Sequence, residues 1–194
     1  MPDAGESTTD VVMAIQDPYM DQIINGTKNY EFRKYCLKPD VKRIWFYRNA
    51  PHSALTHVCE ILPAHTRNPG DTALEGDAAL EEDGIGNAEF NSRHKDWDGY
   101  DFAYKILSVY ELRKPIPLTE MITACGFQAA PRGLLYLPRA TEERVLWYRQ
   151  KLVLKNEGVA SHTLAESVPA RTDGETIPRE SNAYPMDPGN EEFG

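Results

Sequence analysis

The sequence has few cysteines, and their spacing excludes two common kinds of framework. Cys36, Cys59 and Cys125 lie far apart and form no CxxC pair. An odd number of cysteines at wide spacing matches neither a disulfide framework nor a zinc site. We therefore expect reduced and mostly buried thiols, which are typical of an intracellular protein, cytoplasmic or nuclear.

Long apolar stretches are absent as well. No apolar run approaches the ~18 residues that a membrane-spanning helix needs. The first ten residues, MPDAGESTTD, are acidic and polar, unlike a signal or transit peptide. The sequence therefore predicts a protein without a membrane partner.

The motifs of several enzyme classes are missing too. There are no His, Asp and Glu residues at metal-ligand spacing, no glycine-rich phosphate loop and no GxSxG element. We expect no metal site and no cofactor, so that any catalysis would be that of a metal-independent hydrolase.

The chain also lacks an excess of basic residues, since its formal net charge is −9. Most of this acidity lies in residues 1–10 and 155–194, and the part between them is close to neutral. Within that part, KYCLKPDVKR (34–43) is mainly basic, whereas residues 71–84 hold six acids and no base. Such a dipolar surface can bind a phosphate backbone locally, although ordinary solvated charges explain it equally well.

The two ends of the chain differ in composition from its middle. Residues 1–10 are predicted to be disordered, and residues 157–194, rich in Pro, Gly, Ser and Glu, to be a polar acidic tail without a core. One domain is predicted over residues 11–156. Inside it, residues 66–98 show no sustained periodicity and are predicted to form a long acidic loop or insertion, which is more often functional than neutral.

Apolar runs and turn signals give the expected order of elements. Six strands are predicted, at residues 11–15, 26–34, 41–48, 54–62, 100–112 and 130–138. A short helix capped by Asp17 follows the first strand, another is capped by Thr119, and a C-terminal helix capped by Thr141 is predicted over residues 140–156. The fold class expected is α+β: a small β-barrel of about five to six strands with short flanking helices and a C-terminal helix.

One short stretch, GTKNYEFRK (26–34), combines both signs of charge with two aromatics. With a period of two, Lys28 shares a face with Tyr30 and Phe32, and the other face carries the remaining charges. Either these charges are solvated, or several of them point into a common cleft.

The order of segments around this stretch resembles a known family. A helix is followed by NGTKNYEFRK, RIWFYRNAP, FAYKILSVYELRKPIPL and GFQAAPRGLLYL, an order similar to that of the activating-signal-cointegrator homology (ASCH) family, a branch of the PUA-like barrels. Its G-x-K-x-x-E-x-R pattern is met by Gly26, Lys28, Glu31 and Arg33. The resemblance covers residues 11–140, without the acidic insertion. It implies a PUA-like barrel with a cleft that binds single-stranded RNA or a nucleotide, modified or unmodified.

Six side chains are the candidates for binding such a ligand. The two motif cations suit phosphate contacts, an aromatic side chain suits base stacking and an amide can read a base edge. These candidates are Lys28, Glu31, Arg33, Tyr47, Asn49 and Arg132. Structural alternatives remain open: Lys28 can extend to solvent, Glu31 can pair with Arg33, and Trp45, beside Tyr47, suits a core better than a stacking surface.

Catalysis is the second hypothesis. The resemblance includes hydrolases of acylated cytidine, which carry a threonine three residues after the motif lysine. Here that position is Glu31, and the nearby Thr27 precedes the lysine. A Lys28–Glu31 acid–base pair is the remaining catalytic arrangement. A binding module is favoured, with a hydrolase as the alternative and a protein-interaction module that uses the acidic tail as the third.

Overall fold

The computed structural model describes residues 5–68, 70 and 73–156. Contacts divide the chain into Met1–Gly158 and Val159–Gly194. The predicted tail, residues 157–194, and residues 1–4 lie outside the described residues.

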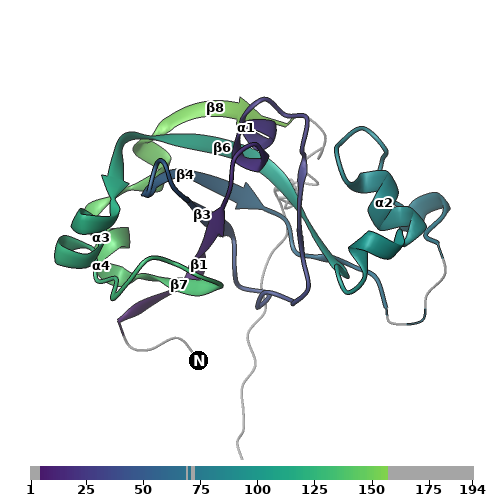
Figure 1. Cartoon of the computed structure of the whole chain (residues 1–194), viewed down its shortest axis with the longest axis horizontal. Coiled ribbons are helices and arrows are strands. Elements are labelled where there is room, and N and C mark those ends of the chain that lie inside the picture. Colours follow the sequence, from purple (N-terminus) through teal and green to yellow (C-terminus); the bar gives the residue numbers. More distant parts are fainter. Residues whose placement is uncertain (1–4, 69, 71–72, 157–194) are drawn as a thin grey trace, which may run out of the picture. The chain divides into compact units, whose positions relative to one another are not determined.

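Eight strands form one mixed sheet (Figure 1). The strands are β1 (Glu6–Ile15), β2 (Tyr30–Arg33), β3 (Arg43–Arg48), β4 (Ala54–Ile61), β5 (His65–Thr66), β6 (Phe102–Pro117), β7 (Leu135–Pro138) and β8 (Lys151–Lys155). Their order is β2-β6-β4-β3-β1-β7, and β5 and β8 also pair with β6. Strand β1 runs parallel to β3, whereas the other described pairs are antiparallel.

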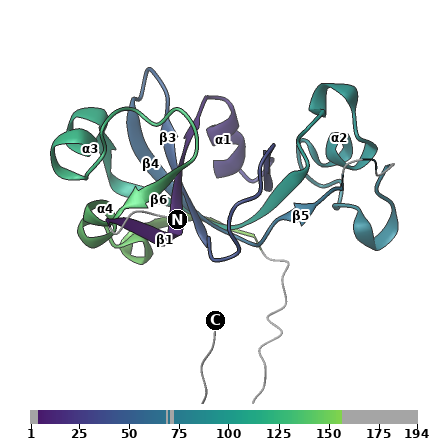
Figure 2. The same cartoon turned by 90° about the horizontal axis from the view of Figure 1, so that it is seen from below.

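The helices are short and lie at the ends of the strands. They are α1 (Tyr19–Ile24), α2 (Asn87–Ser92), α3 (Leu118–Ala124) and α4 (Arg139–Arg144), with 3-10 turns η1 (Gly76–Ala78), η2 (Lys95–Trp97) and η3 (Trp147–Arg149). Helix α2 lies beyond one end of β6, and α3 and α4 lie near its other end (Figures 1 and 2). The predicted α+β class is confirmed.

The sheet is compatible with the PUA-like barrel that the resemblance implies, but it is not strictly closed. Within the described residues, the terminal strands of the order, β2 and β7, do not pair with each other. The sheet also has two more strands than the six predicted. Strand β5 is only two residues long, and β8 lies where a helix was expected.

Strand β3 lies in the middle of the sheet and is buried on both faces. Its alternate residues enter two separate cores: Ile44 and Phe46 pack in one, and Trp45 and Tyr47 in the other. This follows from the period of two of a strand. Tyr47 is only 4% exposed, so the prediction that it stacks on a ligand base is wrong.

The first strand begins earlier than the sequence predicts. Strand β1 starts at Glu6, so the prediction of disorder is wrong for residues 6–10. Polar contacts, rather than apolar burial, hold this part: the buried Asp10 carboxylate accepts hydrogen bonds from Arg43 Nε at 2.9 Å and Trp45 Nε1 at 2.8 Å. Composition alone cannot show such pairs.

The predicted C-terminal helix is present but much shorter than residues 140–156. Helix α4 ends at Arg144, and residues Lys151–Lys155 pair with β6 as strand β8. Thr141 is not the helix cap; its buried hydroxyl donates to the Cys125 carbonyl oxygen at 2.8 Å. Residues 151–155, KLVLK, hold three consecutive apolar residues, and their pairing with β6 prevails over the helical pattern.

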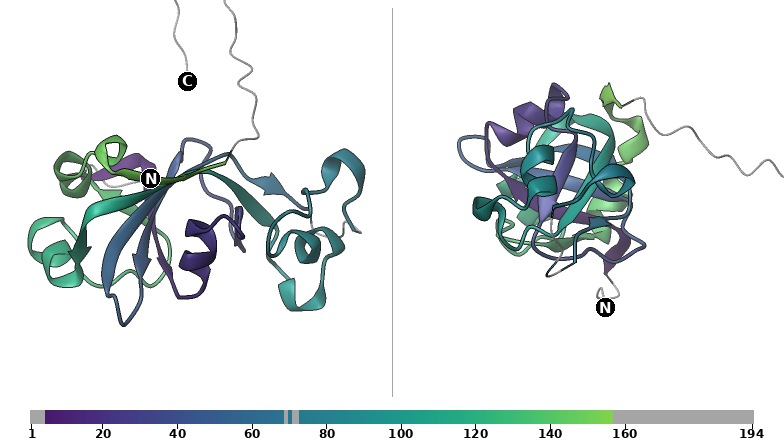
Figure 3. Two further views of the ribbon diagram at one scale, coloured as in Figure 1. Left: turned by 90° about the horizontal axis from the view of Figure 1, so that it is seen from above. Right: turned by 90° about the vertical axis from the view of Figure 1, so that its right-hand side faces the viewer.

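The insertion has structure of its own rather than being one long loop. It contains η1, α2 and η2, and Figures 2 and 3 show this part gathered beyond β5. A third core holds it in place, in which Leu80 and Phe90 pack against Tyr30 and Phe32 of β2. The aromatic face of the motif strand is therefore covered by the insertion.

Candidate ligand-binding site

A cavity of about 490 Å³ lies beside the motif strand. Its lining comes from β1, α1, β2, the end of β3 and the insertion: Ala14, Ile15, Gln16, Tyr19, Lys28, Glu31, Phe32, Arg33, Asn49, Asp96, Trp97 and Tyr100. This volume falls within the range of small-molecule sites, about 300–1,000 Å³.

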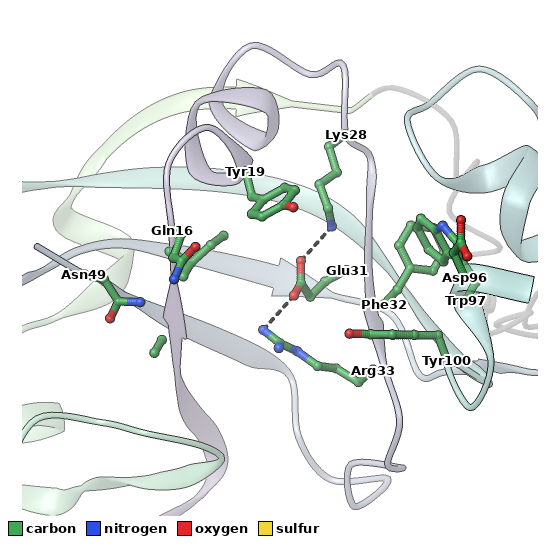
Figure 4. A pocket seen from close by; sticks show the side chains of 12 residues that line it. Gln16, Tyr19, Lys28, Glu31, Phe32, Arg33, Asn49, Asp96, Trp97 and Tyr100 are labelled. Atoms are coloured by element: carbon green, nitrogen blue, oxygen red, sulfur yellow. Dashed lines mark hydrogen bonds and ion pairs between the residues drawn. The ribbon is translucent and has the colours of Figure 1, made fainter.

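Three charged side chains of the motif form a row in this cavity, with the Glu31 carboxylate in the middle (Figure 4). Glu31 Oε2 lies 2.7 Å from Lys28 Nζ, and Glu31 Oε1 lies 2.6 Å from Arg33 Nη2. The Glu31 side chain is 7% exposed and that of Arg33 is 23% exposed. Each carboxylate oxygen therefore has its own cation, and Arg33 is the most open of the three.

Lys28 can reach Glu31 because it precedes the strand. Strand β2 begins at Tyr30, and the backbone N–H of Lys28 donates to the Gln22 carbonyl oxygen at 3.0 Å. The strand alternation predicted from the sequence thus does not extend to Lys28. Its ammonium also donates to the Tyr30 carbonyl oxygen and lies 5.2 Å from the centre of the Phe32 ring, so the charges of the motif converge beside one of its aromatics.

The charge of Glu31 is fixed by its partners. Burial alone raises the pKa of this carboxyl group, but the charges of Lys28 and Arg33 and the hydrogen bond from Lys28 outweigh burial and hold the pKa below its usual value. Glu31 is therefore an anion at neutral pH, and the row carries one net positive charge.

Arg33 has an unused donor. Its Nε is buried and has no hydrogen-bond partner within the described part of the chain, while Nη2 binds Glu31. A buried donor without a partner costs about 1–3 kcal/mol. A small rotation of the guanidinium toward an acceptor in the cavity would recover that free energy.

Polar and aromatic side chains form the two walls of the cavity. Gln16 and Asn49 lie on one side, and Asp96, Trp97 and Tyr100 on the other (Figure 4). The Tyr19 ring, from α1, is 52% exposed. The walls therefore offer amide groups and rings to a planar ligand.

The insertion wall is fixed by close packing. The Trp97 ring meets the Phe32 ring edge-on at a centroid distance of 4.9 Å. Gly86, at φ +94°, leaves room for both, since a Cβ there would lie 2.4 Å from the Trp97 ring and 2.8 Å from the Phe32 ring. A side chain at this position would displace one of the two rings.

Four of the six predicted ligand-binding residues line the cavity: Lys28, Glu31, Arg33 and Asn49. Tyr47 is in the core, and Arg132 is exposed and is not part of the lining. Sequence analysis missed Tyr19, Trp97 and Tyr100. The unusual length of the segment over residues 66–98 was the signal that could have pointed to Trp97.

Neither metal-ligand clusters nor membrane helices occur in the part that the structure describes. No three His, Cys, Asp or Glu side chains lie close enough together there to bind a metal ion. None of its helices is long and apolar enough to cross a membrane.

Comparison with known proteins gives similar solved structures but no match to a family model or to a curated protein. A serine-to-alanine variant of an ASCH protein from Zymomonas mobilis is 17% identical, with a TM-score of 0.48, and the match covers 72% of this chain and 95% of that chain. The crystal structure of ASCH from Zymomonas mobilis is 19% identical, with a TM-score of 0.42 and coverage of 71% and 94%. A tyrosine-to-phenylalanine variant of that protein is 19% identical, with a TM-score of 0.42, and the match covers 70% of this chain and 95% of that chain. The chain is thus similar to structures named ASCH, and ASCH is also the family that its G-x-K-x-x-E-x-R motif resembles.

Proposed function

We propose that the chain is an ASCH-type domain that binds single-stranded RNA or a nucleotide, modified or unmodified, in the cavity beside β2. One observation carries the proposal: a buried carboxylate, Glu31, holds the Arg33 guanidinium at a cavity whose walls carry rings and amides. Charge-assisted hydrogen bonds to phosphate and stacking on bases are the two contacts that single-strand binders combine.

The state of Glu31 favours binding over catalysis. A general acid needs a proton near neutral pH, and the lowered pKa of Glu31 keeps the group ionised. The observation that favours the alternative, a hydrolase with a Lys28–Glu31 acid–base pair, is the distance of 2.7 Å between Lys28 Nζ and Glu31 Oε2. Thr27 offers no activated nucleophile, because its hydroxyl donates to the Asn25 side-chain oxygen at 2.7 Å.

The interaction-module hypothesis concerns the acidic tail. Residues 157–194 lie outside the described residues, so a protein partner for the tail stays a prediction.

Replacing Arg33 tests the proposal. With a ten-nucleotide oligouridylate, we expect Arg33→Ala to weaken binding about tenfold, as a lost charge-assisted contact does, and the slope of log K against log salt to fall by about 0.7, as for one phosphate on a single strand. Arg33→Lys should keep the slope. Arg132→Ala, which removes an exposed arginine outside the cavity, is the matched control and should change neither quantity. Equal affinities of wild type and Arg33→Ala would refute the proposal for this cavity.

A further inference from the structure

We infer that the cavity takes a single nucleotide unit, with one base and one phosphate, either as a free mononucleotide or as the end of a strand, and not the interior of a continuous strand. This inference rests on the proposed function and specifies the substrate class of the same site.

The cavity has cationic capacity for one phosphate. Its lining holds two cations, Lys28 and Arg33, and two anions, Glu31 and Asp96. The Lys28 ammonium is already bound by Glu31 Oε2 and the Tyr30 carbonyl oxygen. Arg33 is left as the cation with donors to spare, whereas proteins that bind strand interiors line a groove with many cations.

The side of the cavity next to the insertion opposes a phosphate backbone. Residues 73–98 carry eight acidic and two basic side chains. Their acidic part lies against the two residues on either side of Lys28: Asp83 Oδ1 accepts from Asn29 Nδ2 at 2.7 Å, and the Ile85 N–H donates to the Thr27 carbonyl oxygen at 2.8 Å. A strand that continued past this side would bring its phosphates toward exposed carboxylates.

The charges of this acidic part act on the motif strand. Burial raises the pKa of the Tyr30 phenol, and the carboxylates of Asp83 and Glu81 raise it further. The negative potential therefore reaches β2 itself, at the end opposite Arg33.

The Arg33 end of β2 has the reverse charge. Lys34 follows Arg33, is exposed, and places Nζ 4.8 Å from the centre of the Tyr100 ring. Lys38 is exposed as well. A bound phosphate is thus favoured at Arg33 and Lys34, and any further nucleotides can leave only on that side.

The rings around the cavity suit a single base. Tyr19 comes from α1, Trp97 from the insertion and Tyr100 from the segment before β6, so these rings do not form the row along one strand on which successive bases stack. One base among these rings, with its phosphate at Arg33, uses the polar and aromatic groups that the cavity offers.

A circular strand has no end, and this provides the test. The full-length chain is titrated with linear decauridylate, the same decamer circularised, uridine monophosphate and uridine. We expect the linear decamer and the monophosphate to bind, the circle to bind at least about tenfold more weakly than the linear decamer, and uridine more weakly than its monophosphate because it lacks the phosphate contact. Equal affinities for the circular and the linear decamer would overturn this inference but leave the proposed RNA binding in place. No binding of any of the four would overturn the proposed function together with it.

A charge variant tests the cause. The ratio of the affinities for the linear and the circular decamer should fall about threefold or more in the double variant Glu81→Gln, Glu82→Gln. The reason is that this variant removes two exposed carboxylates beside the cavity. Glu142→Gln combined with Glu143→Gln, on α4, removes the same charge far from the cavity lining and should leave the ratio unchanged. An equal ratio in both double variants would contradict the assigned role of the insertion.

Discussion

Among the residues that the structure describes, two buried carboxylates, Asp10 and Glu31, pair with arginines, and their surroundings differ. The Asp10 side chain is 1% exposed and binds Arg43 Nη2 at 2.7 Å and Trp45 Nε1 at 2.8 Å. The Arg43 guanidinium also lies 4.7 Å from the centre of the Trp147 ring. These partners belong to the fold, and neither Asp10 nor Arg43 is among the residues that line the cavity beside β2.

Glu31 also pairs with an arginine, but the hydrogen bonds of that arginine are incomplete. Its arginine leaves Nε without a partner and lies on a cavity. A buried ion pair is thus a poor sign of function by itself, since Asp10 has one too. The unused donor of an arginine that lines a cavity is what distinguishes the candidate site at Glu31 from the structural pair at Asp10.

Removing Asp10 should have the largest effect on stability. Asp10→Ala leaves Arg43 and the Trp45 N–H without their acceptor, and we expect the free energy of unfolding to fall by about 3 kcal/mol. Urea denaturation measures this loss, with Asp40→Ala, at an exposed aspartate, as the control. A loss below about 1 kcal/mol would mean that the Asp10 site resembles an ordinary surface pair.

At His57, burial outweighs the carboxylates of Glu111 and Asp21, which favour the charged ring. Burial lowers its pKa to about 4 from 6.5, so the folded state prefers the neutral ring and stability is lost as the pH falls from 6.5 toward 4. Over this window the wild type should lose about 3 kcal/mol more than His57→Gln, at 1.36 kcal/mol for each unit of the pKa difference. Unfolding titrations in urea at pH 7, 5.5 and 4 compare the two. Parallel pH profiles would show that folding does not lower the pKa of His57.

Glu31→Gln should have a smaller effect and separates the two roles of the motif. The amide keeps the shape but weakens the hold on Lys28 and Arg33, so we expect a loss of about 1–3 kcal/mol in stability at neutral pH. Because the pKa of Glu31 is lowered in the fold, its stabilising contribution is present above the ordinary value of 4.5 and is lost as the pH falls through the folded pKa. The variant should lack that acid-dependent loss.

The same variant tests for catalysis. Affinity for oligouridylate should change less than about tenfold, since Arg33 stays. An acid–base role for Glu31 would instead lower turnover of acylated nucleosides or short RNAs by about 10²–10⁴ with binding nearly intact. If the wild type turns these substrates over and Glu31→Gln shows this loss of turnover, the hydrolase hypothesis would replace the binding proposal.

The sequence predicts the motif strand and its neighbours well because local signals agree there. Gly26 ends the turn after α1 with a φ of +79°, and the aromatic run of β3 alternates between two cores as a buried strand should. The convergence of Lys28, Glu31 and Arg33 follows the family resemblance, although the strand alternation alone places Lys28 on the wrong face.

The rest depends on contacts between distant residues, which one sequence does not display. Strand β8 forms because β6 offers an edge to residues 151–155, and β1 extends to Glu6 because Asp10 meets Arg43. Trp97 reaches the cavity through packing on Phe32, 65 positions earlier in the chain. Propensity and periodicity are local, so these pairings lie beyond them.

The packing of Phe32 under the cavity limits how this protein can vary. Phe32 of the four-residue strand β2 both lines the cavity and packs against the insertion, so a side chain at Gly86 would displace Trp97 or Phe32. The insertion is therefore not an independent loop that could be shortened, exchanged or grafted without a change in the cavity. In protein engineering, it belongs with the candidate site, and substitutions in it would change the cavity wall without touching the charged motif.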